Sequence, residues 1–438
     1  MDFIAAKKYV DGLNKFGSVL GLDNIFKLLE KLNNPQDKLN VIHVAGTNGK
    51  GSTITYMESV LRVANYTTGK YTSPVVFDYL EKFQINGRNI SEDDFVDAFV
   101  IVKDAYEELL AIGITPTIFE FETAMSFIFF EKNNVDVAII ETGMGGDTDA
   151  TNVFNRVLLS VITSISMDHM SFLGNTIEEI ASHKAGIIVD DCPVVVNALN
   201  SDGLKVIKDT AKKKNAKVYE ATTAEEWIDK HGNSYLKYSS AYDDNIFEYI
   251  ETSMKGNYQR ENIALAIEAI LALNREYSNI FNIRMEDIYS GIKEACIQGR
   301  FEMINENPDI YIDGAHNPDA IIKLKDTILK IKTKKKYKNT IFVMGVLADK
   351  DYKSESEVIA PLADYIYTVT PNNIRGLDGE ILKKTIEKFN SNVEFVSDME
   401  SLRDIILGGD DYKDNLVVIF GSLSYLNDIK EIIGQVVY

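Results

Sequence analysis

Short apolar runs alternate with amphipathic stretches along nearly the whole chain. The runs are rich in Val and Ile with few intervening polar residues, a pattern typical of strands buried on both faces of a parallel sheet. Such strands are predicted at residues 41–45, 135–140, 157–163, 194–196, 310–312, 341–344, 365–369 and 416–420. Apolar residues at helical spacing predict helices between them, among them 177–184, 261–273, 285–293 and 319–330. This alternation predicts an α/β fold with a mostly parallel sheet.

A short polar turn around Gly299 interrupts the pattern. The helix predicted at 285–293 ends before it, and a new strand–helix series starts at residue 310. We therefore expect two domains, residues 1–296 and 297–438. The aromatic-rich segment 223–250 predicts hairpins instead of strand–helix units, as an antiparallel extension of the first domain.

The charge balance of the chain limits the classes of molecule that it is expected to bind. The chain has 46 Lys and Arg against 66 Asp and Glu, a net charge of −20, which disfavours nucleic acid and anionic membranes. The basic run KTKKKYK at 332–338 is interpreted as a solvated helix end and loop, with a nucleic-acid contact as the alternative. Two cysteines give no disulfide framework, and neither a signal-peptide core nor a membrane-length apolar run is visible. We expect a cytoplasmic enzyme that acts on small molecules.

The segment NVIHVAGTNGKGS at 40–52 combines a buried strand, a glycine-rich loop and a helix expected to open at Ser52. The glycines let consecutive N–H groups point at a phosphate, and Lys50 would neutralise its oxygens. The alternative is a plain strand–helix turn. The full Walker pattern is absent, because Val44 replaces its first glycine and Gly51 follows Lys50. The hydroxyl that normally holds Mg²⁺ must therefore come from elsewhere.

Polar residues also follow other predicted strands, where ligands bind in open α/β sheets. Glu141 follows the strand 135–140, and a carboxylate there is a natural Mg²⁺ ligand. Asp168 and His169 follow the strand 157–163, where a purely structural role is the alternative. DGAHNP at 313–318 follows a strand of the second domain.

Together these phrases resemble the folylpolyglutamate synthases and bifunctional dihydrofolate synthases of the ATP-dependent Mur ligase superfamily. The resemblance covers nearly the whole chain and rests on about ten phrases in order. They are GLDNIFKLLEKLNNPQ at 21–36, HVAGTNGKGS at 43–52, TSP at 72–74, ING at 85–87, TIFEFETA at 117–124, ETGMGG at 141–146, DATN at 149–152, DHMSFLGNTIEEIASHKAGII at 168–188, GNYQRENIALA at 256–266, GRFE at 299–302 and DGAHNP at 313–318.

The resemblance implies a P-loop ATPase domain followed by a smaller, Rossmann-like carboxyl-terminal domain. It also implies the activity: ATP phosphorylates a folate carboxylate, and the amine of L-glutamate displaces the phosphate to leave an amide. The implied substrates are ATP, L-glutamate and a reduced folate, with Mg²⁺ at two sites, and relatives of this kind are commonly monomeric.

The resemblance also implies roles for particular residues. Nucleotide binding is implied for Thr47, Asn48, Gly49, Lys50, Gly51, Ser52, Asn262, Arg300 and Asp313. Mg²⁺ binding is implied for Ser73, Glu141, His169 and Lys184, the last as a carbamate. Catalytic roles are implied for Lys50, Lys184 and His316. The pterin side of the substrate is assigned to Phe119, Glu120 and Phe121.

Without the resemblance, several of these residues would be interpreted differently. Lys184 would be a solvated helix lysine, and Asn262 an ordinary polar residue of an Ala-rich helix. The aromatic residues Phe119 and Phe121 would belong to the core.

The chain departs from the family pattern on the segments that face the pterin. Val75 stands where His is usual, Glu-Lys-Phe at 81–83 replaces Glu-Arg-Ile, and Asp147 stands where Arg is common. Acceptance of dihydropteroate therefore stays open. The alternatives are another Mur-type ligase acting on a cell-wall or polyamino-acid precursor and, more remotely, a nucleotide-binding switch module, for which no guanine motif is found.

Overall fold

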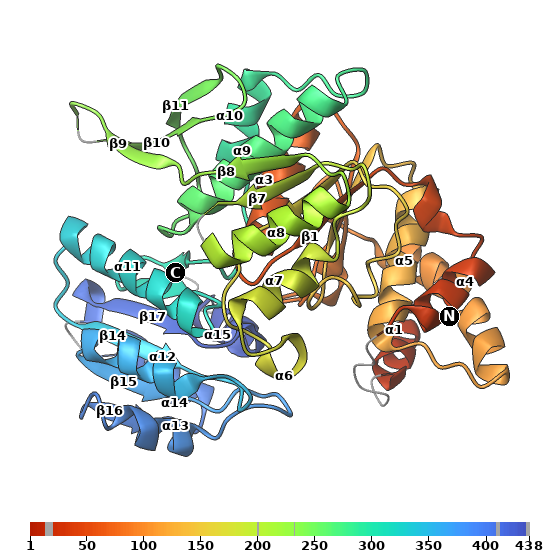
Figure 1. The fold of residues 1–438 in the computed structure, drawn as a ribbon. Helices are drawn as coiled ribbons and strands as arrows, with labels where there is room; N and C mark the ends of the chain where they lie inside the picture. The colour runs from red at the N-terminus through yellow and green to blue at the C-terminus, as the bar shows by residue number, and fades with distance from the viewer. Residues whose placement is uncertain (14–20, 199–200, 232, 409–411, 435–438) are drawn as a thin grey trace. The chain divides into compact units, whose positions relative to one another are not determined.

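The structure is a computed structural model that describes residues 1–13, 21–198, 201–231, 233–408 and 412–434. The chain forms two compact units (Figure 1). Unit 1 contains Met1–Ser253 and Arg260–Cys296, and unit 2 contains Met254–Gln259 and Ile297–Tyr438. The short segment 254–259, expected in the first domain, groups with unit 2 because Tyr258 Oη donates to Asp313 Oδ2 at 2.8 Å.

Unit 1 is built on an eight-stranded sheet within the described residues, in the order β4-β3-β2-β5-β1-β6-β7-β8. The six strands from β2 to β8 in this order are parallel, while β3 and β4 add an antiparallel edge. The expected mostly parallel sheet is confirmed. The strands are β1 (Val41–Ala45), β2 (Thr68–Tyr71), β3 (Phe83–Ile85), β4 (Arg88–Asn89), β5 (Val137–Glu141), β6 (Leu159–Ile162), β7 (Val194–Asn197) and β8 (Val218–Ala221).

Helices cover both faces of this sheet (Figure 1). On one face lie α7 (Ile177–Ala185) and α8 (Ser201–Lys213), packed through buried aliphatic side chains on β6 and β7. On the other lie α3 (Lys50–Val63), α9 (Gln259–Glu276) and α10 (Met285–Glu294). Helix α3 begins two residues earlier than the expected start at Ser52, because Gly49 takes φ +87° and serves as its N-cap.

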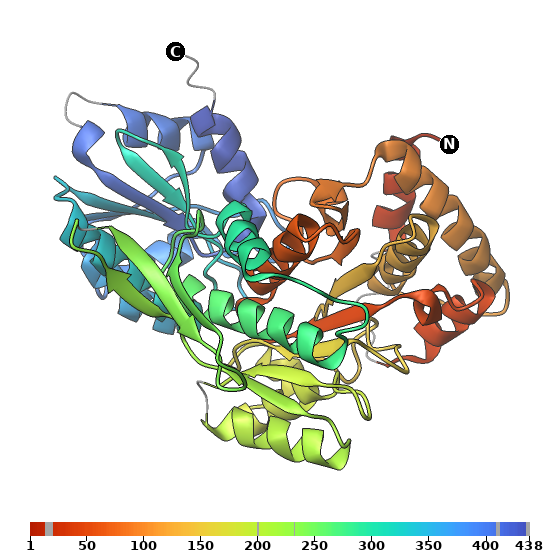
Figure 2. The ribbon, with the colours of Figure 1, turned by 90° about the horizontal axis from the view of Figure 1, so that it is seen from above.

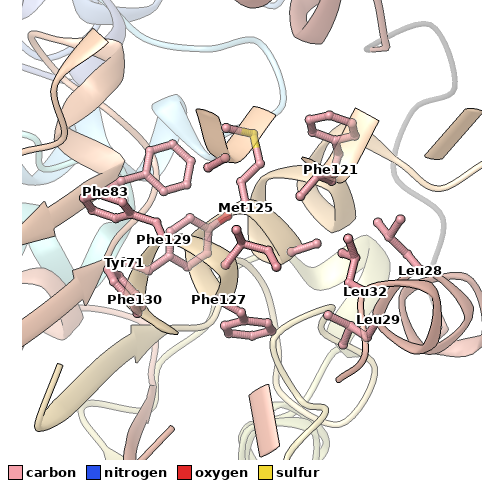
Figure 3. Packing of buried hydrophobic residues seen from close by; sticks show 14 of the residues in the cluster. Leu28, Leu29, Leu32, Tyr71, Phe83, Phe121, Met125, Phe127, Phe129 and Phe130 are labelled. Atoms are coloured by element: carbon pink, nitrogen blue, oxygen red, sulfur yellow. The ribbon is translucent and has the colours of Figure 1, made fainter. Parts of the chain in front are cut away.

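A helical layer at one end of unit 1 was not predicted as such. It consists of α1 (Phe3–Gly12), α2 (Asp23–Lys31), α4 (Glu92–Ala111) and α5 (Ile118–Lys132), which gather together in both views (Figures 1 and 2). Its core is rich in aromatic rings, and the same cluster contains Phe121, Phe127 and Phe130 of α5 together with Tyr71 and Phe83 (Figure 3). Because α5 is apolar on nearly every side, it is buried between the sheet and the other helices.

The expected hairpins at 223–250 are confirmed. An antiparallel three-stranded sheet has the order β11-β10-β9, with β9 (Glu225–Ile228), β10 (Ser234–Ser239) and β11 (Ile246–Ile250).

Unit 2 holds a six-stranded sheet within its described residues, in the order β12-β13-β17-β14-β15-β16, parallel except for β12. Its strands are β12 (Glu302–Asn305), β13 (Asp309–Ile312), β14 (Thr340–Met344), β15 (Tyr365–Thr368), β16 (Val393–Phe395) and β17 (Leu416–Phe420). Its helices are α11 (Pro318–Lys334), α12 (Tyr352–Ile359), α13 (Gly379–Ile386), α14 (Met399–Leu407) and α15 (Leu426–Gly434). Throughout the described part of the chain, no helix combines the length and apolarity needed to span a bilayer.

Candidate active site

The glycine-rich loop after β1 is held in shape by the segment that follows β6. A Cβ on Gly46 would lie 1.7 Å from Thr163 Oγ1, so only glycine fits at this point. Thr47 N donates to Ser164 O at 2.7 Å, and Asn48 N donates to Ser164 Oγ at 3.0 Å. The loop is thus fixed before any ligand binds. Sequence reasoning missed this support, although the hydroxyl-rich run TSIS at 163–166, at the end of a predicted strand, was a usable signal.

Asn262 contacts the same loop from α9. Gly49, the last loop residue before α3, has φ +87°, and a Cβ there would lie 2.4 Å from Asn262 Oδ1. The predicted nucleotide residue Asn262 is therefore brought to the P-loop, while Gly51 and Ser52 lie in the first turn of α3.

Two lysines converge on one backbone carbonyl of the loop. Lys50 Nζ donates to Gly46 O at 3.1 Å, and Lys184 Nζ donates to the same oxygen at 2.9 Å. Lys184 is only 4% exposed. Burial, followed by the nearby charge of Lys50, lowers the pKa of Lys184 to about 7. At neutral pH the amine of Lys184 is therefore unprotonated, and so nucleophilic, in a substantial fraction of the molecules.

The predicted metal ligands Glu141 and Ser73 also meet. Glu141 ends β5 and is 5% exposed, and its Oε1 lies 3.8 Å from Lys50 Nζ. Its other oxygen, Oε2, accepts a hydrogen bond from the backbone N–H of Ser73 at 3.2 Å. The carboxyl ends of β2 and β5 thus place a carboxylate and a hydroxyl-bearing residue beside the P-loop lysine.

His169, another predicted metal ligand, follows β6 and is more exposed than Glu141. It is the N-cap of the short helix α6 (Met170–Leu173), with φ +50° and a side chain 39% exposed. Its Nε2 lies 4.0 Å from Asp168 Oδ2. In the described residues no three side chains of His, Cys, Asp or Glu cluster as a metal site. A Mg²⁺ that retains waters and phosphate oxygens needs only one or two protein carboxylates, so the donors present fit that ion.

The loop after Glu141 is tied to the helix that carries Lys184. Asp147 N donates to His183 O at 2.9 Å, and the Asp147 carboxylate accepts from His183 Nδ1 at 2.9 Å. A Cβ on Gly146 would lie 2.6 Å from the His183 carbonyl oxygen. Asp147, a departure from the family pattern, therefore has a partner beside Lys184.

A buried hydrogen-bonded chain links this loop to β1. Asp149 Oδ1 accepts from Thr151 Oγ1 at 2.6 Å, and Thr151 Oγ1 lies 2.8 Å from His43 Nε2. Because Thr151 donates to the carboxylate, His43 must donate from Nε2. Burial lowers the pKa of His43 to about 3, so the imidazole is neutral. Sequence reasoning had assigned no role to these residues.

The three residues assigned to the pterin separate in the structure. Phe119 lies against the loop after Glu141, since a Cβ on Gly143 would be 2.7 Å from its ring, and it stacks on Tyr71 at 6.1 Å. Glu120 instead caps α5, where its Oε2 accepts from Thr117 N at 2.6 Å. Phe121 is fully buried among core aromatic rings.

The remaining predicted residues lie together in unit 2, at the turn after β13. Asp313 is buried and accepts from Phe301 N and Ala315 N, both at 2.8 Å, as well as from Tyr258. Burial raises the pKa of Asp313. A Cβ on Gly314, the next residue, would lie 2.4 Å from Arg300 Nη1, so Arg300 packs against this turn.

His316 follows in the same turn. Its Nδ1 lies 2.7 Å from Gly314 O. A carbonyl oxygen only accepts, so Nδ1 carries the hydrogen of this bond.

Comparisons with known proteins place the chain in a family. The family model of the Mur ligase middle domain matches residues 44–270, and that of the Mur ligase glutamate ligase domain matches residues 299–423. The dihydrofolate synthase/folylpolyglutamate synthase of Bacillus subtilis is 35% identical over 436 residues, covering 97% of this chain and 98% of the relative. The folylpolyglutamate synthase of Lacticaseibacillus casei is 34% identical over 392 residues, covering 86% and 87%.

Solved structures show the same fold over the full length. E. coli FolC in complex with DHPP and ADP aligns with a TM-score of 0.86 and 27% identity, covering 99% of this chain and 98% of that one. Mycobacterium tuberculosis folylpolyglutamate synthase complexed with ADP gives a TM-score of 0.87 and 26% identity, covering 99% of both chains. The chain belongs to the dihydrofolate synthase/folylpolyglutamate synthase family, whose domains are those of the Mur ligases.

Proposed function

We propose that this protein is an ATP-dependent ligase that joins L-glutamate to the carboxylate of a reduced folate, a tetrahydrofolylpolyglutamate synthase, acting as a monomer. Whether it also makes dihydrofolate from dihydropteroate is left to experiment. One observation carries the proposal: the P-loop, two lysines, Glu141 and Ser73 converge in a chain 35% identical to a dihydrofolate synthase/folylpolyglutamate synthase along 97% of its length.

The proposed reaction has two steps. The folate carboxylate attacks the γ-phosphorus of ATP, which gives an acyl phosphate and ADP. The amine of glutamate then attacks the acyl carbon, and phosphate leaves as the amide forms and the nitrogen loses a proton. Both steps require that anions be held close together, which favours fixed N–H groups and cations over flexible ones.

The chain's own groups suit these steps. The loop amides at 47–52 and the Lys50 ammonium would hold the triphosphate, with the amino end of α3 adding its positive potential. In unit 2, Arg300 and Asp313 are proposed for the nucleotide, and His316, in the turn after β13, is proposed to lie close to the nucleotide or the incoming glutamate.

Ser73, Glu141, His169 and Lys184 would hold Mg²⁺, at two sites. When bound, the ion offsets the negative charge of the transferred phosphoryl group. Glu141 and Ser73 already lie in contact, and the hydroxyl of Ser73 would replace the one that Gly51 cannot supply.

We further propose that Lys184 carries a carbamate. Its neutral amine would attack the carbon of CO₂ and lose a proton, which turns a cation into an anion able to hold a metal. The pKa of about 7 leaves enough neutral amine for this reaction. The product keeps one N–H, which is all that the bond to Gly46 O requires.

Phe119, Glu120 and Phe121 stay proposed for the pterin side of the substrate. The structure favours Phe119 among them, because its ring borders the loop that follows Glu141.

Release of phosphate from ATP with L-glutamate tests the function, with tetrahydrofolate and dihydropteroate compared as acceptors. Turnover with tetrahydrofolate alone supports a synthase restricted to polyglutamates, and turnover with both supports the bifunctional enzyme. Absence of turnover with either would refute the folate assignment and favour another Mur-type ligase.

The carbamate has a separate test. Intact-mass measurement of the native protein in bicarbonate should show an added CO₂ that Lys184→Met lacks. An unmodified amine at saturating bicarbonate would count against it.

A further inference from the structure

A buried ion pair in unit 1 has no role in the proposed chemistry. Lys82 Nζ donates to both carboxylate oxygens of Glu122, at 2.5 and 2.6 Å, and the two side chains are only 13% and 3% exposed. Tyr79 Oη donates to the same carboxylate at 2.7 Å, and Lys82 Nζ lies 5.0 Å from the centre of the Tyr79 ring. The carboxylate is therefore satisfied from two sides.

Stability alone is a poor reason for such a pair. Removing two charges from water costs several kcal/mol each, and an apolar pair of similar volume is often equally or more stabilising. The surroundings are apolar, since Tyr79 packs against Phe95 and the neighbouring Leu80 and Phe83 are buried. A buried polar contact at this place is better explained by the conformation that it selects.

The conformation concerned is that of the loop at residues 72–82. Its base is closed by Thr72 N donating to Lys82 O at 3.1 Å. Its interior is filled by the Glu81 carboxylate, which accepts from Val76 N, and from Phe77 N at 3.4 Å. The loop is therefore closed by a hydrogen bond at its base and held from inside by the Glu81 carboxylate.

Carboxylates from two different elements hold the two ends of this loop. Glu141, on β5, accepts from the backbone of Ser73 at the first end. Glu122, on α5, binds Lys82 at the last end. Glu122 lies one helical turn after Phe119, so α5 positions both the loop and the ring that borders the Glu141 loop.

The loop carries an apolar surface next to the phosphate site. Val75, Val76 and Phe77 are all partly exposed, and Ser73, two residues earlier, contacts Glu141. An acceptor whose carboxylate lies at the phosphate site must place its flat aromatic part on nearby apolar surface. This loop and Phe119 provide such a surface.

We propose that Glu122 and Lys82 are positioning residues that fix the loop 72–82 for binding of the acceptor. This inference rests on the proposed function for the identity of the acceptor. Loss of the pair releases the last end of the loop and therefore weakens binding of the acceptor. Binding of ATP, which is proposed for the P-loop, should be nearly unaffected.

The test uses Lys82→Met and Glu122→Gln, singly and together, with Lys82→Arg as the conservative variant. Each single variant leaves a buried group without its partner and is expected to lower the melting temperature. The double variant restores charge balance, so it recovers stability and keeps the experiment interpretable if a single variant fails to fold. The exposed pair Lys31–Glu108 supplies the control Lys31→Met.

Two measurements decide the outcome. In the double variant, the KM for tetrahydrofolate should rise about tenfold or more, while the KM for ATP changes less than about twofold. In Lys82→Arg, the KM for tetrahydrofolate should stay close to the wild-type value. Amide hydrogen exchange at 73–78 should accelerate without a change in α3. A double variant that recovers stability together with wild-type folate KM and loop exchange would overturn the proposal.

Failure of the proposed function gives a different pattern. Wild-type protein would then turn over no folate, yet loop exchange would still respond to the variants if the pair fixes the loop. Unchanged exchange in every variant refutes the positioning role whatever the substrate.

Discussion

At the scale of single residues, the two lysines on the Gly46 carbonyl are suited to different tasks. Lys50 lies at the start of α3, and its Nζ lies 3.8 Å from the Glu141 carboxylate. Lys184 is almost completely buried and lies beside another cation, which favours its neutral form. The proposed phosphate role falls to Lys50, and the proposed carbamate falls to the buried amine of Lys184.

Replacement of Lys50 by Ala tests the first task. We expect turnover to fall by about 10²- to 10³-fold or more, because a fixed charge on the transferred phosphoryl group is lost. Phosphate release measures this, and circular dichroism should show an unchanged fold. Lys38→Ala, at a lysine side chain that is 54% exposed, is the control and should retain full activity. Full activity in Lys50→Ala would refute the phosphate role.

The substitution Lys184→Met tests whether the amine of Lys184 is neutral, through the pH dependence of the free energy of unfolding. An unfolded lysine keeps its proton up to about pH 10.4, whereas folded Lys184 releases it near pH 7. The unfolded state binds more protons in this window, so wild-type stability rises with pH across it. Lys184→Met should therefore gain up to a few kcal/mol over wild type at pH 6–7, a gain that shrinks towards pH 10.

Urea denaturation in bicarbonate-free buffer without nucleotide measures this difference. Lys31→Met, at an exposed lysine, is the control and should track wild type across the range. A stability difference in Lys184→Met that does not vary with pH would show that the amine is not shifted.

At the scale of elements, the P-loop helix α3 depends on a close approach to α10. A Cβ on Gly291 of α10 would lie 2.4 Å from the Val60 backbone Cα of α3. No flexible side-chain end is available to move aside, so the two helices would have to separate. The helix that starts with Lys50 is thereby set by a glycine far away in the sequence.

Gly291→Ala should destabilise the protein by about 1–3 kcal/mol and lower its melting temperature. Gly12→Ala is the matched control, because a Cβ there meets no atom within 4 Å and Ala is the better helix former. We expect Gly12→Ala to be neutral or slightly stabilising. Equal stability of Gly291→Ala and wild type would mean that the two helices adjust freely.

At the scale of the whole molecule, each unit has its own buried core. The aromatic cluster of Figure 3 belongs to unit 1, whereas the cluster around Leu324 and Phe342 belongs to unit 2. Units with separate cores can unfold separately.

Calorimetry should therefore show two transitions. Leu324→Ala removes a fully buried side chain and should lower only the transition of unit 2, by about 2–5 kcal/mol in stability. Mg²⁺-ATP should raise the transition of unit 1, which holds the P-loop, by more than that of unit 2, for which only Arg300 and Asp313 are proposed as nucleotide contacts. A single transition that both treatments shift equally would show that the units unfold as one.

The net charge of −20 has a related consequence for binding. ATP, glutamate and a folate are all anions, so the acidic surface repels them at long range. Under the proposed function, unit 1 offsets this repulsion with Lys50 and the amino end of α3, and unit 2 does so with Arg300.

The sequence by itself determined what depends on local pattern. Val- and Ile-rich runs predicted most parallel strands to within a few residues, and the polar residue after each strand predicted Glu141 and the turn at 313–316. These signals are local because the apolar run that forms a buried strand and the polar residue at its end are adjacent in the sequence. The family phrases added the expectation that Ser73, Lys184 and Asn262 belong to one site.

Only the tertiary structure decided which distant groups touch. It placed Lys184 on the Gly46 carbonyl, 138 residues away in sequence. It also paired Lys82 with Glu122 of α5, a helix in the layer that periodicity did not reveal. It also separated Phe119, beside the Glu141 loop, from Phe121 in the core, although the two are neighbours in one helix. Local pattern cannot settle such matters, because they depend on how whole elements pack, and packing also sets the burial that shifts the pKa of Lys184.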